Sequence, residues 1–142
     1  MKADLMEPQL QSKIYGKDSI IRLDEGLIGF SEFKNFVLAE TGEIKPFRII
    51  QSADSSEVGF VVLDPRFQID DYYNQIPARE WKAIGVVNPA NRLAFVIVNV
   101  GLNAREITAN FQAPILVNYE KMTGRQVILT DSGFGLRMAV VV

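Results

Sequence analysis

Thr108-Ala-Asn-Phe-Gln-Ala-Pro-Ile-Leu-Val-Asn118 has the composition of a β-strand that is interrupted by one proline. Pro114 has no N–H to donate to a neighbouring strand, and it favours an extended backbone at Ala113. The run therefore predicts a strand that bends, lies at a sheet edge or changes partner at Pro114. Asn110 and Gln112 lie two residues apart just before the proline, so their amides share one face of the strand. Such amides can satisfy the backbone groups that a bend leaves unpaired.

On both sides of this run, short apolar segments are separated by Gly, Asp, Asn and Pro. This spacing is typical of an antiparallel sheet or a small barrel. We expect strands at residues 12–15, 19–23, 35–40, 47–52, 58–64, 92–100, 107–111, 115–119 and 126–130. The first two would be joined by the turn Gly16-Lys17-Asp18. The predicted fold class is mainly β: a small, antiparallel, β-barrel-like single domain with one short helix.

The short helix is expected at residues 77–85, because proline suits a first helical turn and glycine suits a C-terminal stop. Ala78, Trp81 and Ile84 would share the face that covers part of the sheet. A second short turn is expected at residues 120–124.

At 142 residues, the chain fits one domain that can bury its own core. We assign this domain to residues 11–133 and leave 1–10 and 134–142 as terminal segments of uncertain order. In residues 59–63 and 93–100, both alternating sets of side chains are mostly apolar. Strands of this kind are covered on both faces, either because the sheet curls around them or because a partner covers the remainder.

The composition removes several classes of chemistry. Because the chain contains no cysteine, it has no disulfide, thiolate metal ligand or cysteine nucleophile. Because it contains no histidine, it lacks the usual general base, the Ser-His-Asp triad and imidazole metal ligands. No motif places a serine, threonine or lysine as an activated nucleophile. We therefore expect a protein that is not an enzyme and that holds no cofactor or metal.

The distribution of charge points to a protein partner. The net charge is −2, but residues 31–75 hold eight acidic and four basic side chains, whereas residues 76–142 hold four acidic and seven basic ones. The basic residues are scattered among acids, without the basic and aromatic stripe that single-stranded nucleic acid requires. No apolar stretch approaches the roughly 18 to 20 residues of a membrane helix. We expect no direct nucleic-acid or membrane binding, and a cytoplasmic location.

Asp64-Pro-Arg-Phe-Gln-Ile-Asp-Asp-Tyr-Tyr73 is the densest candidate site. Its three acids could bind a divalent cation or act as paired carboxylates, although the order of a calcium loop is missing. Asp64 could instead close a strand through an Asp-Pro turn, with Asp70 and Asp71 on a solvated loop. A third interpretation is a contact surface, in which aromatic side chains anchor a partner and acids select a basic one.

Several motifs, in the same order, resemble those of the flagellar assembly factor FliW family. They include the run from Thr108 to Ile115, the loop Leu23-Asp-Glu-Gly-Leu-Ile-Gly-Phe-Ser-Glu-Phe33 and the strand end Phe60-Val-Val-Leu-Asp-Pro65. The loop has Ile28 where the family pattern has proline. Further matches are Phe36-Val-Leu38, Ile50-Gln-Ser52 and Gly124-Arg-Gln-Val-Ile-Leu129. Together the matches span about residues 14–133.

The resemblance implies a regulator of flagellar assembly that works by partner switching. Members of this family bind the RNA-binding translational repressor CsrA and antagonise it, and they bind flagellin in alternation with it. The residues that we expect at a partner surface are Phe67, Asp70, Asp71, Tyr72 and Tyr73, with Asn110 and Gln112 as a second group. Two alternatives stay open at this point: a carboxylate- or metal-dependent small hydrolase, and a small RNA-binding β-barrel.

Overall fold

The computed structural model describes residues 20–39, 42–101 and 106–141. Nine strands make up its sheet: β1 (Ile20–Leu23), β2 (Asn35–Ala39), β3 (Arg48–Ser52), β4 (Gly59–Leu63), β5 (Arg92–Val100), β6 (Ile107–Ala109), β7 (Ile115–Asn118), β8 (Thr123–Gln126) and β9 (Met138–Ala139). The helices described are α2 (Tyr72–Gln75) and α3 (Ala78–Ala83), with 3-10 turns η2 (Gly42–Ile44), η3 (Pro65–Phe67) and η4 (Pro89–Asn91). The prediction of a mainly β fold is confirmed.

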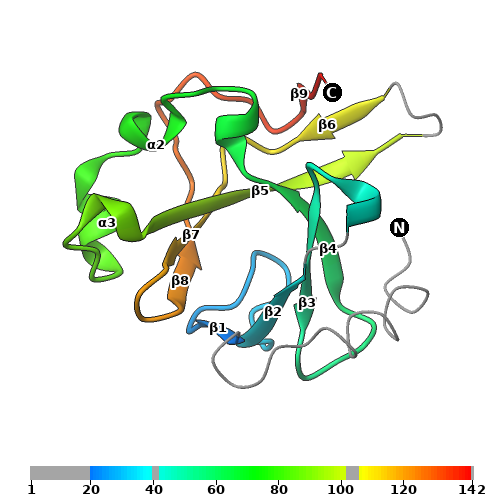
Figure 1. Ribbon diagram of the computed structural model, residues 1–142, viewed down its shortest axis with the longest axis horizontal. Coiled ribbons are helices and arrows are strands. Elements are labelled where there is room, and N and C mark those ends of the chain that lie inside the picture. Colours follow the sequence, from blue (N-terminus) through cyan, green and yellow to red (C-terminus); the bar gives the residue numbers. More distant parts are fainter. Residues whose placement is uncertain (1–19, 40–41, 102–105, 142) are drawn as a thin grey trace.

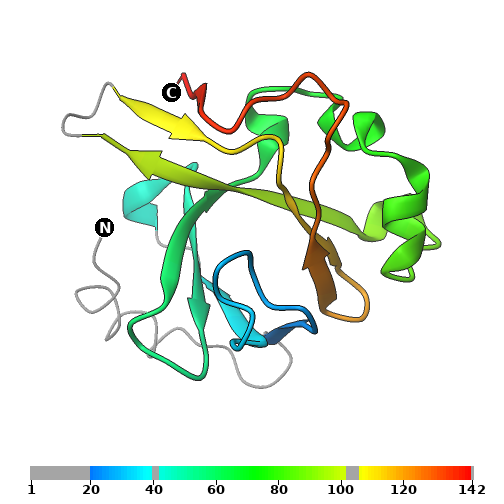
Figure 2. The same cartoon turned by 180° about the vertical axis from the view of Figure 1, so that it is seen from behind.

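The sheet closes into a ring (Figures 1 and 2). Its order is β4-β3-β2-β1-β8-β7-β5-β6-β9, and a further pairing of β4 with β5 joins the first seven strands in a circle. β1 and β8 run parallel, with Arg22 opposite Thr123, whereas the other pairings are antiparallel. A closed ring with an odd number of strands cannot alternate in direction throughout, so one parallel pair is required. The expected antiparallel sheet is correct apart from this pair.

The middle of the long strand β5 is covered on both of its faces, whereas its last two residues, Asn99 and Val100, are exposed. Its side chains alternate between two apolar clusters: Ala94, Val96 and Val98 belong to one, and Phe95 belongs to the other. The first cluster includes residues of α2, α3 and the segment after β8, which lie over this side of β5 (Figure 1). The second cluster joins β5 to β1, β2, β3 and β7. Burial within the chain therefore explains the doubly apolar pattern of residues 93–98, but not Val100, which is 57% exposed.

The bend at Pro114 forms as predicted, and it lets one run of sequence pair twice with the same strand. Before the bend, Ala109 of β6 pairs with Val98 of β5, and after it Ile115 of β7 pairs with Phe95. The side-chain oxygen of Asn110 accepts hydrogen bonds from the backbone N–H groups of Gln112 and Ala113, both at 3.1 Å. The bend is thus stabilised by an amide side chain, as the sequence suggested for Asn110.

Gln112 does not have the matching role. The carbonyl of Ala113 accepts instead from the side chain of Gln126, at 3.0 Å. Gln112 contributes its backbone carbonyl, which accepts from Leu129 N–H at 2.7 Å. Of the two amides that could satisfy the bend, the side chain of Asn110 does so.

Strand β8 lies earlier than the predicted strand at residues 126–130. The turn before it spans residues 119–122, where Met122 has a positive φ of 54°, and Gly124 is already paired. Gly124 is required there, because an added Cβ would clash with the backbone carbonyl of Leu116. The predicted turn at 120–124 was therefore placed slightly late. After Gln126 the chain stays extended but loses regular pairing, since its neighbour is the proline bend.

Helix α3 confirms the predicted helix, and Gly85 follows it with a φ of 80°. Trp81 is buried and Ile84 is half-buried, whereas Ala78 is exposed, so the predicted apolar face is correct for two of its three residues. Helix α2 was not expected. The predicted strand at 12–15 and its turn at Gly16, Lys17 and Asp18 lie outside the described residues.

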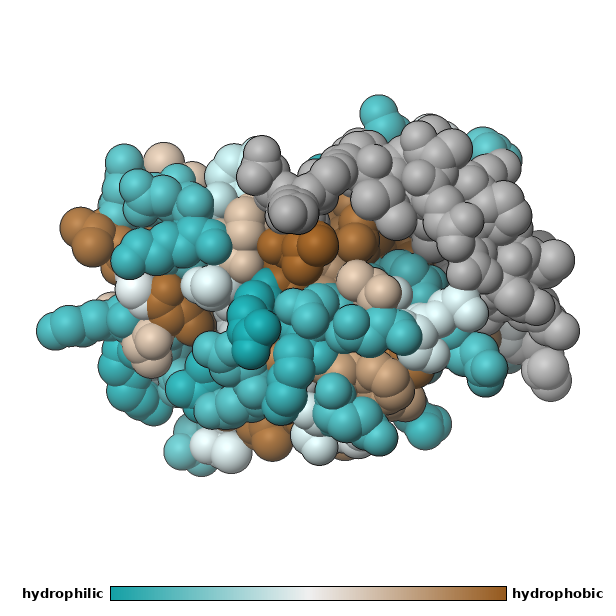
Figure 3. Space-filling view, turned by 90° about the horizontal axis from the view of Figure 1, so that it is seen from below, coloured by the Kyte–Doolittle hydropathy of each residue, from teal (hydrophilic) through white to brown (hydrophobic). Residues whose placement is uncertain are grey.

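On the side of the molecule where β1 lies, hydrophilic residues cover most of the described surface that is visible, and hydrophobic ones gather near the centre of the view and in smaller patches (Figure 3). Among the described residues, no helix is long and apolar enough to cross a membrane.

Candidate functional site

The segment from Asp64 to Tyr73 begins where β4 ends. Asp64 caps the 3-10 turn η3, because its Oδ1 accepts from Arg66 N–H at 3.0 Å. Its Oδ2 pairs with the Arg66 guanidinium at 2.7 Å. This hydrogen bonding raises the pKa of Arg66. The Asp-Pro turn predicted from the sequence therefore forms, and it directs the chain away from the sheet toward α2.

Tyr73 fills the place next to β5 that β4 leaves when it ends at Leu63. The Tyr73 hydroxyl accepts from Ala94 N–H at 2.7 Å and donates to Asp64 Oδ2 at 3.0 Å. The Arg66 guanidinium lies over its ring, 4.1 Å from the centroid. Burial raises the pKa of Tyr73, and the nearby Asp64 carboxylate raises it further. The tyrosine is thus held neutral and replaces a missing strand partner.

Tyr72 connects the same segment to the proline bend. Its side chain has an exposed fraction of 0%, and its hydroxyl donates to the backbone carbonyl of Phe111. Its ring packs against the rings of Phe111 and Phe134, at centroid distances of 5.8 Å and 4.9 Å. Burial raises the pKa of Tyr72. The segment is therefore fixed at its base by contacts with two distant parts of the chain.

These contacts correct two of the predicted site residues. Tyr72 and Tyr73, with exposed fractions of 0% and 4%, are core residues and cannot contact a partner directly. The sequence was misleading because tyrosine beside acids suits a binding surface as well as a core position with a hydroxyl to satisfy. The choice between a binding surface and a core position depends on whether backbone groups, here those of Ala94 and Phe111, lie close to the hydroxyls. The sequence around the tyrosines does not show this.

Three other predicted residues are exposed. Phe67 has an exposed fraction of 48%, which is high for a large aromatic residue, and Asp70 and Asp71 are both exposed. Asp71 accepts a hydrogen bond from the side chain of Gln75 at 2.9 Å, and neither aspartate forms an ion pair with a described residue. The structure therefore presents one aromatic side chain and two carboxylates available to a partner.

Asn110 and Gln112, the second group of predicted site residues, are half-buried at the bend. The Asn110 side-chain oxygen is already occupied by two backbone N–H groups. Their position supports the bend, to which Tyr72 is also bound, and does not place them beside the exposed aspartates.

Sequence reasoning missed that the C-terminal segment lies beside Gln68, the residue that follows Phe67. Gln68 donates from Nε2 to the carbonyl of Ala139 at 2.7 Å and accepts at Oε1 from Val141 N–H at 3.0 Å. Val141 is consequently held next to this segment, with 77% of its side chain exposed. We call Phe67, Asp70, Asp71 and Val141 the Phe67 surface. The only sequence signal was the apolar end of the chain, which fits an edge strand as well as a frayed tail.

The hydrolase interpretation requires acids that converge. Asp64 faces Arg66 and Tyr73, whereas Asp70 and Asp71 are exposed, and no group of three acids in the described ranges could hold a metal ion. This dispersed arrangement argues against a carboxylate- or metal-dependent hydrolase at this segment.

Comparison with known proteins identifies the family. Residues 8–140 match the family model described as FliW protein. The chain is 34% identical to the flagellar assembly factor FliW of Caldanaerobacter subterraneus subsp. tengcongensis, covering 89% of this chain and 85% of that protein. It is also 34% identical to the flagellar assembly factor FliW of Leptospira interrogans, covering 94% and 93%.

A solved structure agrees with these relatives. The crystal structure of a flagellar assembly factor FliW superimposes with a TM-score of 0.79 at 32% identity, covering 89% of this chain and 88% of the other. The agreement in sequence and fold extends over nearly the whole domain, so it is not limited to one motif. This chain belongs to the FliW family of flagellar assembly factors.

Proposed function

We propose that this chain is a cytoplasmic regulator that binds a CsrA-type translational repressor and flagellin in alternation. Free flagellin occupies the chain and leaves the repressor active, whereas export of flagellin releases the chain to bind and antagonise the repressor. The outcome follows from the relative affinities and concentrations of the two partners, because each partner lowers the fraction of chain available to the other. In this role the chain acts by binding and catalyses no reaction.

The observation that carries this proposal is the Phe67 surface. An RNA-binding repressor must present basic groups to bind phosphates. Asp70 and Asp71 form no ion pair within the described chain, so their charges are free to attract such a partner. Phe67 and Val141 add exposed apolar area that a partner can bury. Charge then governs the rate of encounter, and the apolar contacts govern how long the complex lasts.

The base beneath this surface is rigid enough to present it in one geometry. Tyr72 and Tyr73 hold the end of the segment to Phe111 and Ala94, and Asp64 holds its beginning to Arg66. A fixed surface loses less conformational entropy on binding than a loose loop does. Tyr72 and Tyr73 therefore support the partner surface without contacting the partner.

The decisive experiment measures association with a purified CsrA-type protein at low and high salt. The double variant Asp70→Lys/Asp71→Lys is expected to slow association by about tenfold at low salt, and by less at high salt. Glu57→Lys/Glu120→Lys is the matched control, since both glutamates are exposed and the change in net charge is the same. Equal slowing by the two double variants would remove Asp70 and Asp71 from the interface.

Partner switching requires a second measurement. Purified flagellin, titrated into the preformed complex, is expected to displace the CsrA-type protein. A pull-down from the cytoplasm of a flagellated bacterium, with this chain as bait, is expected to recover one or both proteins. Recovery of neither would overturn the proposed function.

A further inference from the structure

The segment at residues 127–129 is extended and has one paired backbone edge and one open edge, and Thr130 follows it in a turn. On the paired side, Val127 N–H donates to the carbonyl of Pro114 at 3.0 Å, and Leu129 N–H donates to that of Gln112 at 2.7 Å. Backbone groups of successive residues in an extended chain point in opposite directions. The N–H and C=O groups of Ile128 and the N–H of Thr130 therefore point away from the bend. Thr130 begins the turn that Ser132 N–H closes onto the carbonyl of Leu129 at 3.4 Å, and the backbone groups of Ile128 and Thr130 form no hydrogen bond within the described chain.

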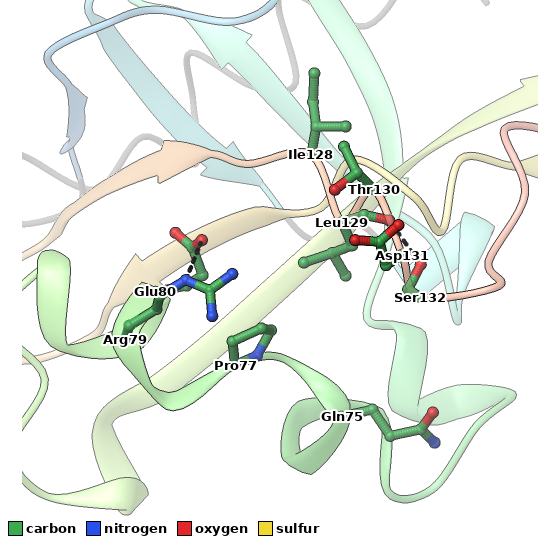
Figure 4. Close-up of a pocket in the computed structure, with 9 residues that line it drawn as sticks. All are labelled: Gln75, Pro77, Arg79, Glu80, Ile128, Leu129, Thr130, Asp131 and Ser132. Carbon is green, nitrogen blue, oxygen red and sulfur yellow. Dashed lines mark hydrogen bonds and ion pairs between the residues drawn. The ribbon is translucent and has the colours of Figure 1, made fainter.

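The open edge lines a groove. Residues 128–132 form one wall of a cavity of about 180 Å³, and the opposite wall comes from the end of α2 and from α3 (Figure 4). That opposite wall consists of Gln75, Pro77, Arg79 and Glu80. Pro77 has no N–H to donate across the groove. The protein's own chain thus leaves the open edge without a strand partner, yet encloses a space beside it.

Carboxylates stand on both walls of this groove. Glu80 lies on the helix side, where Arg79 approaches it only to 3.7 Å with a largely exposed side chain. Asp131 lies on the strand side and forms no ion pair with a described residue. An occupant with a positive charge between Glu80 and Asp131 would gain from both, whereas a neutral or acidic one would not.

At β9, the last strand in the sheet order, a side chain occupies the backbone hydrogen-bonding groups of the open edge. At β9, the side chain of Gln68 donates to the carbonyl of Ala139 and accepts from the N–H of Val141. This amide takes the place that a neighbouring strand would occupy, which protects the edge from pairing with another chain. No side chain does the same for Ile128 and Thr130.

We propose that the open edge at residues 127–130 accepts an extended peptide segment of a partner protein, which adds as a strand and places a lysine or arginine between Glu80 and Asp131. Main-chain hydrogen bonds to Ile128 and Thr130 supply affinity, and the two carboxylates select the basic side chain. This site shares no residue with the Phe67 surface, although Asp71 accepts a hydrogen bond from Gln75 of the groove wall, and the proposal stands whether or not that surface binds a CsrA-type protein.

The first test selects peptides from a phage-displayed library of random heptapeptides. Selection against the wild-type chain is expected to enrich extended, β-branched sequences with a central lysine or arginine. The parallel selection uses Thr130→Pro, which removes one of the two open donors at an exposed position. Failure to enrich any peptide on the wild-type chain, or equal enrichment on both chains, would overturn the proposal.

The second test leaves the protein unaltered. The best peptide is compared with the same peptide N-methylated at the residues that would pair, and amide hydrogen exchange at Ile128 and Thr130 is followed by NMR. The unmodified peptide is expected to slow exchange at these two amides, and N-methylation is expected to weaken binding about tenfold or more. Binding that is indifferent to N-methylation, or that leaves both amides unprotected, contradicts strand addition.

Selectivity for a basic side chain is tested with Asp131→Asn, which keeps the shape of the groove. This variant is expected to bind the lysine peptide several-fold more weakly and to bind a norleucine analogue as before. The variant Glu57→Lys/Glu120→Lys, which changes two exposed residues outside the groove, serves as control and is expected to retain full peptide affinity. If the protein alone dimerises with concentration and protects Ile128 and Thr130, the occupant is a second copy and the proposal of a partner peptide is wrong.

Discussion

The segment between Asp64 and Tyr73 has two faces that differ in purpose although they share one short sequence. On one face, Tyr72 and Tyr73 are buried, and their hydroxyls complete the hydrogen bonding of distant backbone groups. On the other, Phe67, Asp70 and Asp71 remain available to solvent. The difference teaches that aromatic residues next to acids do not identify a binding surface by themselves, because the backbone that they meet decides their role.

The largest effect that separates the faces is expected from Tyr72→Ala. Removing a buried aromatic ring and the partner of the Phe111 carbonyl should lower the free energy of unfolding by about 3–5 kcal/mol. Phe67→Ala is the matched change on the exposed face, and it should cost less than about 1 kcal/mol. Urea unfolding followed by tryptophan fluorescence measures both. Similar losses for the two variants would show that the faces are not distinct.

Tyr73→Phe removes only the hydroxyl that accepts a hydrogen bond from Ala94 N–H in place of a neighbouring strand. The substitution leaves the ring in place but deprives Ala94 N–H of its acceptor, which should cost about 1–3 kcal/mol. Tyr119→Phe is the control, because Tyr119 is 62% exposed. A loss at Tyr73 no greater than that at Tyr119 would mean that water replaces the hydroxyl at Ala94.

Alkaline pH should distinguish the faces through ionisation. Burial raises the pKa of Tyr72 and Tyr73 in the folded protein, whereas in the unfolded chain tyrosine ionises near pH 10. Above that pH the unfolded state loses protons that the folded state retains, so stability is complete below pH 10 and falls as pH rises. The loss should reach about 1.4 kcal/mol for each tyrosine at one pH unit above.

The measurement is the free energy of unfolding as a function of pH, with tyrosinate absorbance recorded in parallel. Tyr72→Phe should reduce the alkaline loss by about half, and Tyr119→Phe should leave it unchanged. If the unfolding free energy of Tyr72→Phe falls at alkaline pH as much as that of the wild type, groups other than Tyr72 cause the loss.

The smallest effect on stability, and a clear effect on binding, is expected from Phe67→Ser. The unfolding free energy should change by about 0.5 kcal/mol or less. Dissociation of a CsrA-type partner should become about tenfold faster, since an aromatic anchor is lost while the acids remain. Stopped-flow dissociation measures this directly, and an unchanged rate would remove Phe67 from the proposed interface.

The sequence predicted those parts of the fold that depend on local chemistry. Pro114 determines a bend wherever it is placed in a sheet, and Asn110 is a suitable side chain to satisfy that bend, so both could be predicted. The helix that carries Trp81 on its buried face and ends before Gly85 could be predicted for the same reason, because its sequence signal is local. The mainly β class followed from the spacing of apolar segments, and the family from motifs in order.

The parts that could not be predicted depend on residues far apart in the chain. The position of β8 is set by Gly124 against Leu116 and by the proline bend across from residues 127–129, which no local pattern shows. The burial of Tyr72 depends on Phe111 and Phe134. The contact of Gln68 with the C-terminal strand joins residues about 70 positions apart, and a lone glutamine carries no signal for it.

The parallel pairing of β1 with β8 has a consequence for the synthesis of this protein on the ribosome. The ring cannot close until the ribosome has added Thr123, the partner of Arg22, about a hundred residues later. At about 5–20 residues per second, that delay is about 5–20 seconds. During this interval β1 can pair with β2, but its other edge has no partner. The ring therefore cannot close before Thr123 has been synthesised, however early the strands β1 and β2 pair.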